Sequence, residues 1–109
     1  MAVNNEVEEI SEKQFNSFVS KSEICAIDFW ASWCMPCLIM HPVIEEMAGK
    51  FKGKIEFAKV NVDDNSKLAE KFSVLSIPTL IIFKKGKEVG RIIGSLSQEK
   101  IEEKLRKYI

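Results

Sequence analysis

The sequence has no excess of charge of either sign. Its 109 residues include 16 Lys and Arg and 16 Asp and Glu, so the formal net charge is zero. Nucleic-acid binders need a basic surface that displaces counterions from phosphates. Binding to a membrane surface needs basic residues beside an amphipathic segment. Neither feature is visible, so the composition argues against nucleic-acid and membrane partners.

Long apolar runs are also missing. The continuous apolar stretches are a few residues long, far short of the roughly 20 residues that cross a bilayer. The N-terminal segment Met-Ala-Val-Asn-Asn-Glu-Val-Glu-Glu lacks the basic start and the apolar stretch of a secretory signal. These two absences predict a cytoplasmic protein.

Cysteine is scarce, with only Cys25, Cys34 and Cys37 in the chain. An odd, small number of cysteines is a poor structural disulfide framework. The chain does not need one, because 46% of its residues are hydrophobic and its length suffices for a core. We expect a single domain over residues 1–109, with residues 1–6 as a flexible tail and Cys25 as a small core residue.

The apolar pattern predicts strands and helices in alternation. A capping serine, Ser97, begins the last helix. The expected strands are 7–10, 24–30, 55–62, 79–83 and 88–93, and the other expected helices are 12–19, 34–51 and 64–72. The order β-α-β-α-β-α-β-β-α indicates an α/β protein whose central mixed sheet is flanked by helices on both faces and ends in an antiparallel hairpin.

Two buried strands each carry one charged residue, Asp28 and Lys59. A charge inside a buried strand costs several kcal/mol unless it is paired or neutralised. Alternation places Asp28 on one face of its strand with Ile24, Ala26 and Trp30, and it places Cys25, Ile27 and Phe29 on the other face. Perturbed carboxyl groups of this kind cluster at functional sites, so Asp28 is a candidate site residue. Lys59 either couples to Asp28 or extends its amine to water.

The segment Trp33-Cys34-Met35-Pro36-Cys37 lies where a buried strand ends and a helix begins. The free amides and the positive end of the helix dipole stabilise an anion there. Cys34, at the exposed start of the helix, is therefore predicted to be the reactive thiolate. Cys37 lies one turn further in, close enough to form a disulfide with it and to resolve a mixed disulfide.

A metal site is the alternative interpretation of these cysteines. His41 follows Cys37 by four residues, so three soft ligands share one helix face. A structural zinc site needs four protein ligands, and the sequence offers no fourth. We therefore expect no metal and treat His41 as an ordinary surface residue of the helix.

Several motifs together resemble the thioredoxin family. They are Asp28-Phe29-Trp30-Ala31, Trp33-Cys34-Met35-Pro36-Cys37, Pro42, Lys59, Ile77-Pro78-Thr79 and Gly94. The resemblance covers almost all of the chain from about residue 7 onward. It implies the thioredoxin fold and a protein dithiol–disulfide oxidoreductase that uses the Cys34–Cys37 pair and no other cofactor.

The resemblance also implies a role for each matched residue. Asp28 would move a proton to or from Cys37, and Lys59 would modulate Asp28. Pro36 would lie between the cysteines, and Pro78 would follow a cis peptide bond that clamps an extended substrate. The residues that would bind the substrate are Trp30, Trp33, Met35, Ile77 and Gly94.

The chain departs from the family pattern at two positions near the cysteines. Met35 replaces the usual Gly, and Leu38 replaces a common Lys or Arg. Both positions are close to the cysteines, where side chains tune the reduction potential. We expect a monomer that reduces protein disulfides and is recharged by a thioredoxin reductase-type donor. A disulfide oxidase or isomerase is an alternative, although Pro36 favours the reductase, and a non-catalytic binding subunit is a further one.

Overall fold

The computed structural model describes residues 7–109, and the flexible tail expected at residues 1–6 lies outside the described residues. The elements follow the predicted order. The strands are β1 (Val7–Glu9), β2 (Ile24–Trp30), β3 (Glu56–Asn61), β4 (Thr79–Lys84) and β5 (Lys87–Ile93). The helices are α1 (Glu12–Lys21), α2 (Met35–Lys50), α3 (Ser66–Lys71) and α4 (Gln98–Arg106).

The five strands form one mixed sheet in the order β1-β3-β2-β4-β5. Strand β3 pairs in parallel with both β1 and β2. Strand β4 is antiparallel to both of its neighbours, β2 and β5. The short strand β1 is at one edge, and the hairpin strand β5 is at the other.

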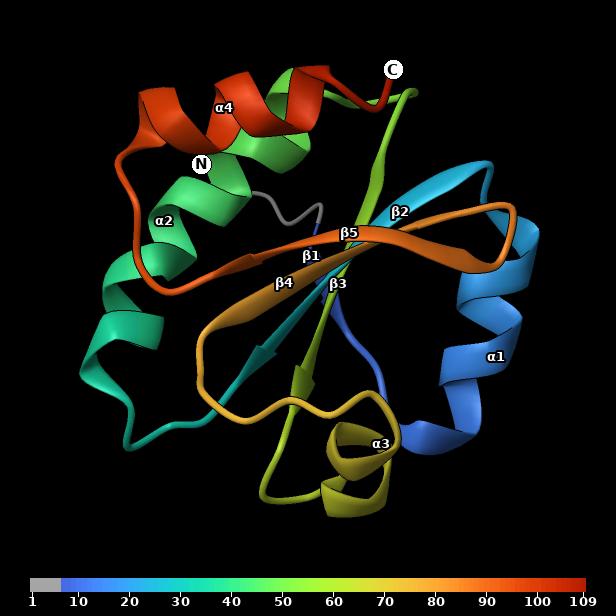
Figure 1. Cartoon of the computed structure of the whole chain (residues 1–109), viewed down its shortest axis with the longest axis vertical. Coiled ribbons are helices and arrows are strands. Elements are labelled where there is room, and N and C mark those ends of the chain that lie inside the picture. The colour runs from blue at the N-terminus through green and yellow to red at the C-terminus, as the bar shows by residue number, and fades with distance from the viewer. Residues whose placement is uncertain (1–6) are drawn as a thin grey trace.

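Helices cover both faces of the sheet (Figure 1). On one face, α2 and α4 pack over Ile24 and Ala26 of β2 through a core that includes Met40, Ile44 and Ile101. On the other face, α1 and α3 enclose a second core with Cys25, Ile27 and Phe29, the alternate residues of β2. The predicted alternation along β2 is therefore confirmed.

The end of β2 leads directly into the C-x-x-C segment. Trp30 ends the strand, and Cys34 is the N-cap of α2. Pro36 lies in the first turn of α2, where its missing N–H leaves no intrahelical bond unmade. The local sequence thus places both cysteines at the carboxyl end of a central strand and at the amino end of a helix.

The β4–β5 hairpin closes at the opposite end of the sheet. Its turn residues, Lys85 and Gly86, both have positive φ angles, of 52° and 83°. The turn is far from the cysteines because β4 runs antiparallel to β2, with Ile24 beside Lys84 and Phe29 beside Thr79. Farther along β5, Gly90 leaves the space that the hydroxyl of Tyr108 occupies.

Candidate active site

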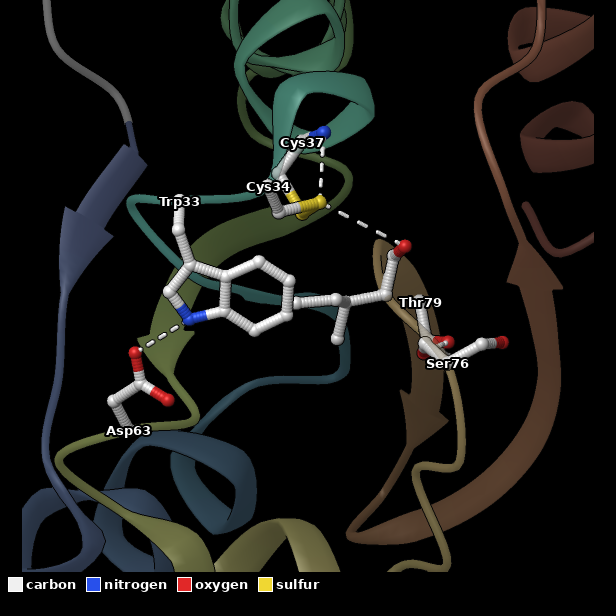
Figure 2. Close-up of a disulfide and its surroundings, with 7 residues drawn as sticks. Trp33, Cys34, Cys37, Asp63, Ser76 and Thr79 are labelled. Carbon is white, nitrogen blue, oxygen red and sulfur yellow. Dashed lines mark hydrogen bonds between the residues drawn. A yellow bond between two sulfur atoms is a disulfide. The ribbon is translucent and has the colours of Figure 1, made fainter.

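A disulfide joins Cys34 and Cys37, whose Cα atoms are 5.2 Å apart. The Cys37 amide donates a hydrogen bond to Cys34 Sγ at 3.2 Å (Figure 2). Because this amide is one of the free donors of the first helical turn, it would also stabilise a thiolate on Cys34 once the disulfide is reduced. The two sulfurs therefore lie as the sequence predicts.

The exposure of Cys34 differs from the prediction. Cys34 was expected at an exposed helix start, but only 5% of its surface is accessible, and Cys37 is fully buried. Ala31 is buried with the two cysteines, and Trp30 and Ile77 pack against this small cluster. Of the two cysteines, only Cys34 therefore presents any surface to solvent.

The segment before β4 faces the disulfide. The peptide bond between Ile77 and Pro78 is cis, the geometry that the resemblance implies for Pro78. The carbonyl oxygen of Ile77 lies 3.8 Å from Cys34 Sγ, and the Thr79 hydroxyl donates to the Ser76 carbonyl at 2.7 Å (Figure 2). The second bond closes a tight turn around Pro78. Backbone of an otherwise distant segment is thus fixed next to Cys34 Sγ.

An exposed apolar surface surrounds the disulfide. Trp33 is 69% accessible and Met35 is also exposed, whereas Ile77 and Gly94 are half-buried. The exposed apolar side chains that the sequence reasoning did not assign to this surface are Leu38, Ile39, Leu75 and Ile93. Leu38 and Ile39 share the first turns of α2 with the cysteines, and Leu75 is two residues before Ile77. For Leu38, Ile39 and Leu75, closeness in the sequence to the cysteines or to Ile77 is the signal that could have indicated them.

Asp63 holds the Trp33 indole, a contact that the sequence did not predict. The indole Nε1 donates a hydrogen bond to Asp63 Oδ2 at 2.9 Å, and Figure 2 shows the ring lying between Asp63 and the cysteines. Asp63 follows β3 and is 30 residues from Trp33 in the chain. No local pattern indicates such a pairing.

Asp28 is buried on the α2 face of β2, with 2% of its surface accessible. Burial raises the pKa of this carboxyl from 3.8 to about 7, while the Lys59 charge lowers it and Glu9 adds to the rise. At neutral pH the group therefore exists in both protonation states. That is the property required of a residue that accepts and returns a proton.

Lys59 is the register neighbour of Asp28 on β3. Its amine lies 5.3 Å from the centre of the Trp30 ring, a distance at which a cation is attracted to an indole face. The coupling of Lys59 to Asp28, expected from the sequence, agrees with the effect of its charge on the Asp28 pKa. Lys59 is half-buried rather than extended freely into water.

His41 does not lie on the open surface, contrary to the sequence-based expectation. It is half-buried, its ring centre is 4.7 Å from that of Trp30, and its Nε2 atom is buried. Burial lowers the His41 pKa from 6.5, the Lys59 charge lowers it further, and Glu45 opposes both effects. Helical periodicity missed this position because α2 is apolar on several sides, so its pattern does not define one inner face.

Cys25 is a buried core residue, as predicted. It is the free cysteine on the α1 face of β2, opposite the face that carries Asp28. Burial raises its pKa to about 12, and Glu56 adds to the rise. Since thiolates rather than thiols are the nucleophiles in exchange, burial keeps Cys25 in its less reactive thiol form at neutral pH.

Within residues 7–109, no three side chains of His, Cys, Asp or Glu come together as a metal site. No helix in that part of the chain has both the length and the apolar character needed to span a bilayer.

A sequence model of the family described as thioredoxin matches residues 6–107. The chain belongs to the thioredoxin family. Thioredoxin 2 of Chlorobaculum tepidum is 41% identical over 102 residues, which cover 93% of this chain and 94% of that protein. Thioredoxin of Staphylococcus haemolyticus is 45% identical over 89 residues, which cover 82% and 86% of the two chains.

A solved structure agrees with this family assignment. A mutant thioredoxin from Halobacterium salinarum matches with a TM-score of 0.86 and 26% identity, over 97% of this chain and 94% of that one. The architecture is therefore the thioredoxin fold. The chain is a thiol–disulfide oxidoreductase of the thioredoxin family and reduces disulfides through its Cys34–Cys37 pair.

Proposed function

We propose that Cys34 is the attacking thiolate of this member of the thioredoxin family. The Cys37 amide, 3.2 Å from Cys34 Sγ at the start of α2, is the observation that carries the assignment. The thiolate attacks one sulfur of a substrate disulfide, forms a mixed disulfide and releases the other substrate sulfur as a thiolate. The released thiolate takes a proton from water. This step conserves electrons because one S–S bond forms as another breaks.

Cys37 then resolves the mixed disulfide. Its thiol must first lose a proton, and the buried carboxylate of Asp28 takes that proton. The Cys37 thiolate attacks Cys34 Sγ, the protein disulfide forms, and the second substrate thiolate leaves. Two electrons have then passed to the substrate. Lys59 modulates the step by favouring the ionised form of Asp28, as its effect on the Asp28 pKa indicates.

The substrate docks as an extended segment along Ile77. The Ile77 backbone next to the cis Pro78 lies close to Cys34, with 3.8 Å between the Ile77 carbonyl oxygen and Cys34 Sγ, so it can pair with substrate main chain as an added strand. Trp33 and Met35 provide exposed apolar contact, and Trp30 and Gly94 complete the surface. Pro36 restricts the backbone between the cysteines and holds the first turn of α2 in its helical form.

Proteins with accessible disulfides are the proposed substrates, and a thioredoxin reductase-type enzyme is the proposed electron donor. We further propose that the protein acts in the cytoplasm as a monomer, forms one domain and needs no cofactor other than its cysteine pair. The thioredoxin names of its relatives support the substrate class and the donor.

Reduction of insulin by a dithiol, monitored with three single substitutions, tests these roles. Cys34→Ser should abolish catalysis. Cys37→Ser should accumulate a mixed disulfide that is visible on a non-reducing gel. Cys25→Ser is the matched control, and it should remain fully active because Cys25 lies on the opposite face of β2.

Alkylation of the reduced protein provides an independent check. Iodoacetamide should modify Cys34 before Cys37 near neutral pH, with peptide mass spectrometry identifying the modified residue. Faster labelling of Cys37, or retention of activity in Cys34→Ser, would overturn the proposed roles.

A further inference from the structure

Three buried side-chain atoms in residues 7–109 have no hydrogen-bond partner: Asp28 Oδ2, Trp30 Nε1 and His41 Nε2. Buried polar atoms are nearly always paired, so their grouping calls for a cause. They belong to one neighbourhood. Asp28 and Trp30 lie on the same face of β2, and the Trp30 ring contacts the His41 ring at 4.7 Å between centres. The group lies beside the disulfide, because Cys37 is one helical turn before His41.

Asp28 needs a route by which its proton can reach solvent. In the proposed reaction Asp28 accepts the Cys37 proton, and it must release that proton before the next cycle. Only 2% of the Asp28 surface reaches solvent, so direct exchange with water is hindered. A second group that can accept and release a proton, and that lies between the buried site and solvent, would provide a route.

His41 has the required properties. Its Nε2 is buried near Trp30, while the residue as a whole is half-exposed. An imidazole can accept a proton at one ring nitrogen and release one from the other. Ordered water needs two or more polar partners, and the unpaired atoms of Asp28, Trp30 and His41 offer them. A proton could therefore pass between Asp28 and His41 through water.

Burial and the Lys59 charge favour the neutral, proton-accepting form of His41. Burial lowers the His41 pKa most, Lys59 on β3 lowers it further, and Glu45 on α2 opposes both, so the neutral ring is favoured. Lys59 also acts on Asp28, and Glu9 on β1 acts on Asp28 in the opposite direction. Asp28 and His41 thus share Lys59 as a common electrostatic neighbour.

We propose that His41 carries protons between the buried Asp28 carboxyl and solvent during each redox cycle. The inference rests on the proposed role of Asp28 as the base for Cys37. During substrate reduction the Cys37 proton moves to Asp28, then to His41, and then to water. During recharging by the dithiol donor, a proton returns along the same path to the Cys37 thiolate. No proton is gained or lost over the complete cycle, since the substrate thiolates take theirs from water.

His41→Phe tests this role because it keeps an aromatic ring against Trp30 and removes the titratable group. The measurement is single-turnover oxidation of the reduced protein by excess protein disulfide in weakly buffered solution, followed by tryptophan fluorescence. We expect oxidation to slow about tenfold, a modest part of the usual effect of acid–base groups. Added imidazole, a mobile proton carrier, should restore the rate. Glu46→Gln, on an exposed position of the same helix, should behave as the unmodified protein in both solutions.

Two results would overturn the inference. One is an unchanged rate and pH profile in His41→Phe. The other is a slowed rate that imidazole does not restore, which would make His41 a packing residue only. If His41→Phe does not fold, as judged by circular dichroism, His41→Gln is measured in its place. Either failure leaves the proposed function intact, because that function depends on the Cys34→Ser and Cys37→Ser results.

Discussion

Asp28 and Lys59 are neighbours in register on the parallel strands β2 and β3. Glu9 continues the row as the register neighbour of Lys59 on β1. A buried carboxyl, a half-buried amine and an exposed carboxylate thus lie in line across three strands. Burial disfavours ionised Asp28 most strongly, Lys59 opposes this effect, and Glu9 adds to it. The row explains why the charge on Lys59 does not keep Asp28 fully ionised at neutral pH.

Asp28 should make the protein less stable as the pH rises. Its pKa is raised by folding, so the folded state keeps a proton that the unfolded state loses, and stability declines from about pH 4 to about pH 7. The difference between a pKa of 3.8 and one of about 7 corresponds to roughly 4 kcal/mol at most. Asp28→Asn should therefore be more stable than the unmodified protein above pH 7 and should lack this decline.

Urea unfolding of both proteins across this pH range measures the effect. The same samples should show slower insulin reduction by Asp28→Asn, because the base for Cys37 is missing. A variant that is less stable at all pH values and fully active would show that Asp28 is structural.

Leu38→Lys should make Cys34 a better nucleophile. Leu38 is 42% accessible and directly follows Cys37, so an amine there adds positive charge near the Cys34 thiolate and lowers its pKa. Alkylation of Cys34 below neutral pH should become about twofold faster, since exposed charges have small effects. Val89→Lys is a matched control, because Val89 is 44% accessible and lies on β5 near the distant turn. Equal acceleration by both variants would exclude a local electrostatic cause.

Loss of the Trp33–Asp63 hydrogen bond should weaken substrate binding and leave the fold intact. Trp33→Phe and Asp63→Ala each remove the 2.9 Å bond that orients the exposed indole. We expect KM for a protein disulfide to rise about threefold, which corresponds to one ordinary hydrogen bond. The free energy of unfolding should change by less than about 0.5 kcal/mol, as is usual for surface substitutions.

Asp63→Asn serves as the control because its amide oxygen can still accept the indole N–H, and its KM should stay near the unmodified value. A KM that does not respond to Trp33→Phe would remove the indole from the docking surface.

Gly90→Ala should destabilise the protein. A Cβ on Gly90 would overlap the Tyr108 hydroxyl, and forcing an extra methyl group into a filled space costs about 1–3 kcal/mol. Gly49→Ala is the matched control: Gly49 lies within α2, and a Cβ there meets no atom within 4 Å. It should stabilise the protein by up to about 1 kcal/mol. Urea unfolding compares the two, and equal stability of Gly90→Ala and the unmodified protein would contradict the expected overlap.

Periodic features of this fold could be predicted from the sequence. The alternation along β2 correctly separated Ile24, Ala26 and Asp28 from Cys25 and Ile27, because each face of a buried strand contacts its own helix layer. The predicted element order was confirmed. At most ends of the helices and strands, the predicted and observed bounds differ by one or two residues. The sheet order was not predicted, since it depends on pairing between strands that no local pattern reports.

Features of the site that depend on distant contacts escaped prediction. Cys34 was expected to be exposed, but Ile77 and Trp30 pack against the cysteine cluster. His41 was assigned to the surface, but Trp30 covers part of its ring. In both cases the burial comes from residues brought in by the fold rather than from the residue's own helix.

The β4–β5 turn and the cysteines lie at opposite ends of the sheet. Cys34, Cys37 and the cis bond before Pro78 lie at the end where β2 finishes, whereas the exposed Lys85–Gly86 turn closes the hairpin at the other end. A fluorescent label, a peptide tag or a surface linker attached at this turn would therefore leave the docking side unobstructed. Attachment to a solid support through this turn should therefore leave the disulfide facing the solution and the protein active.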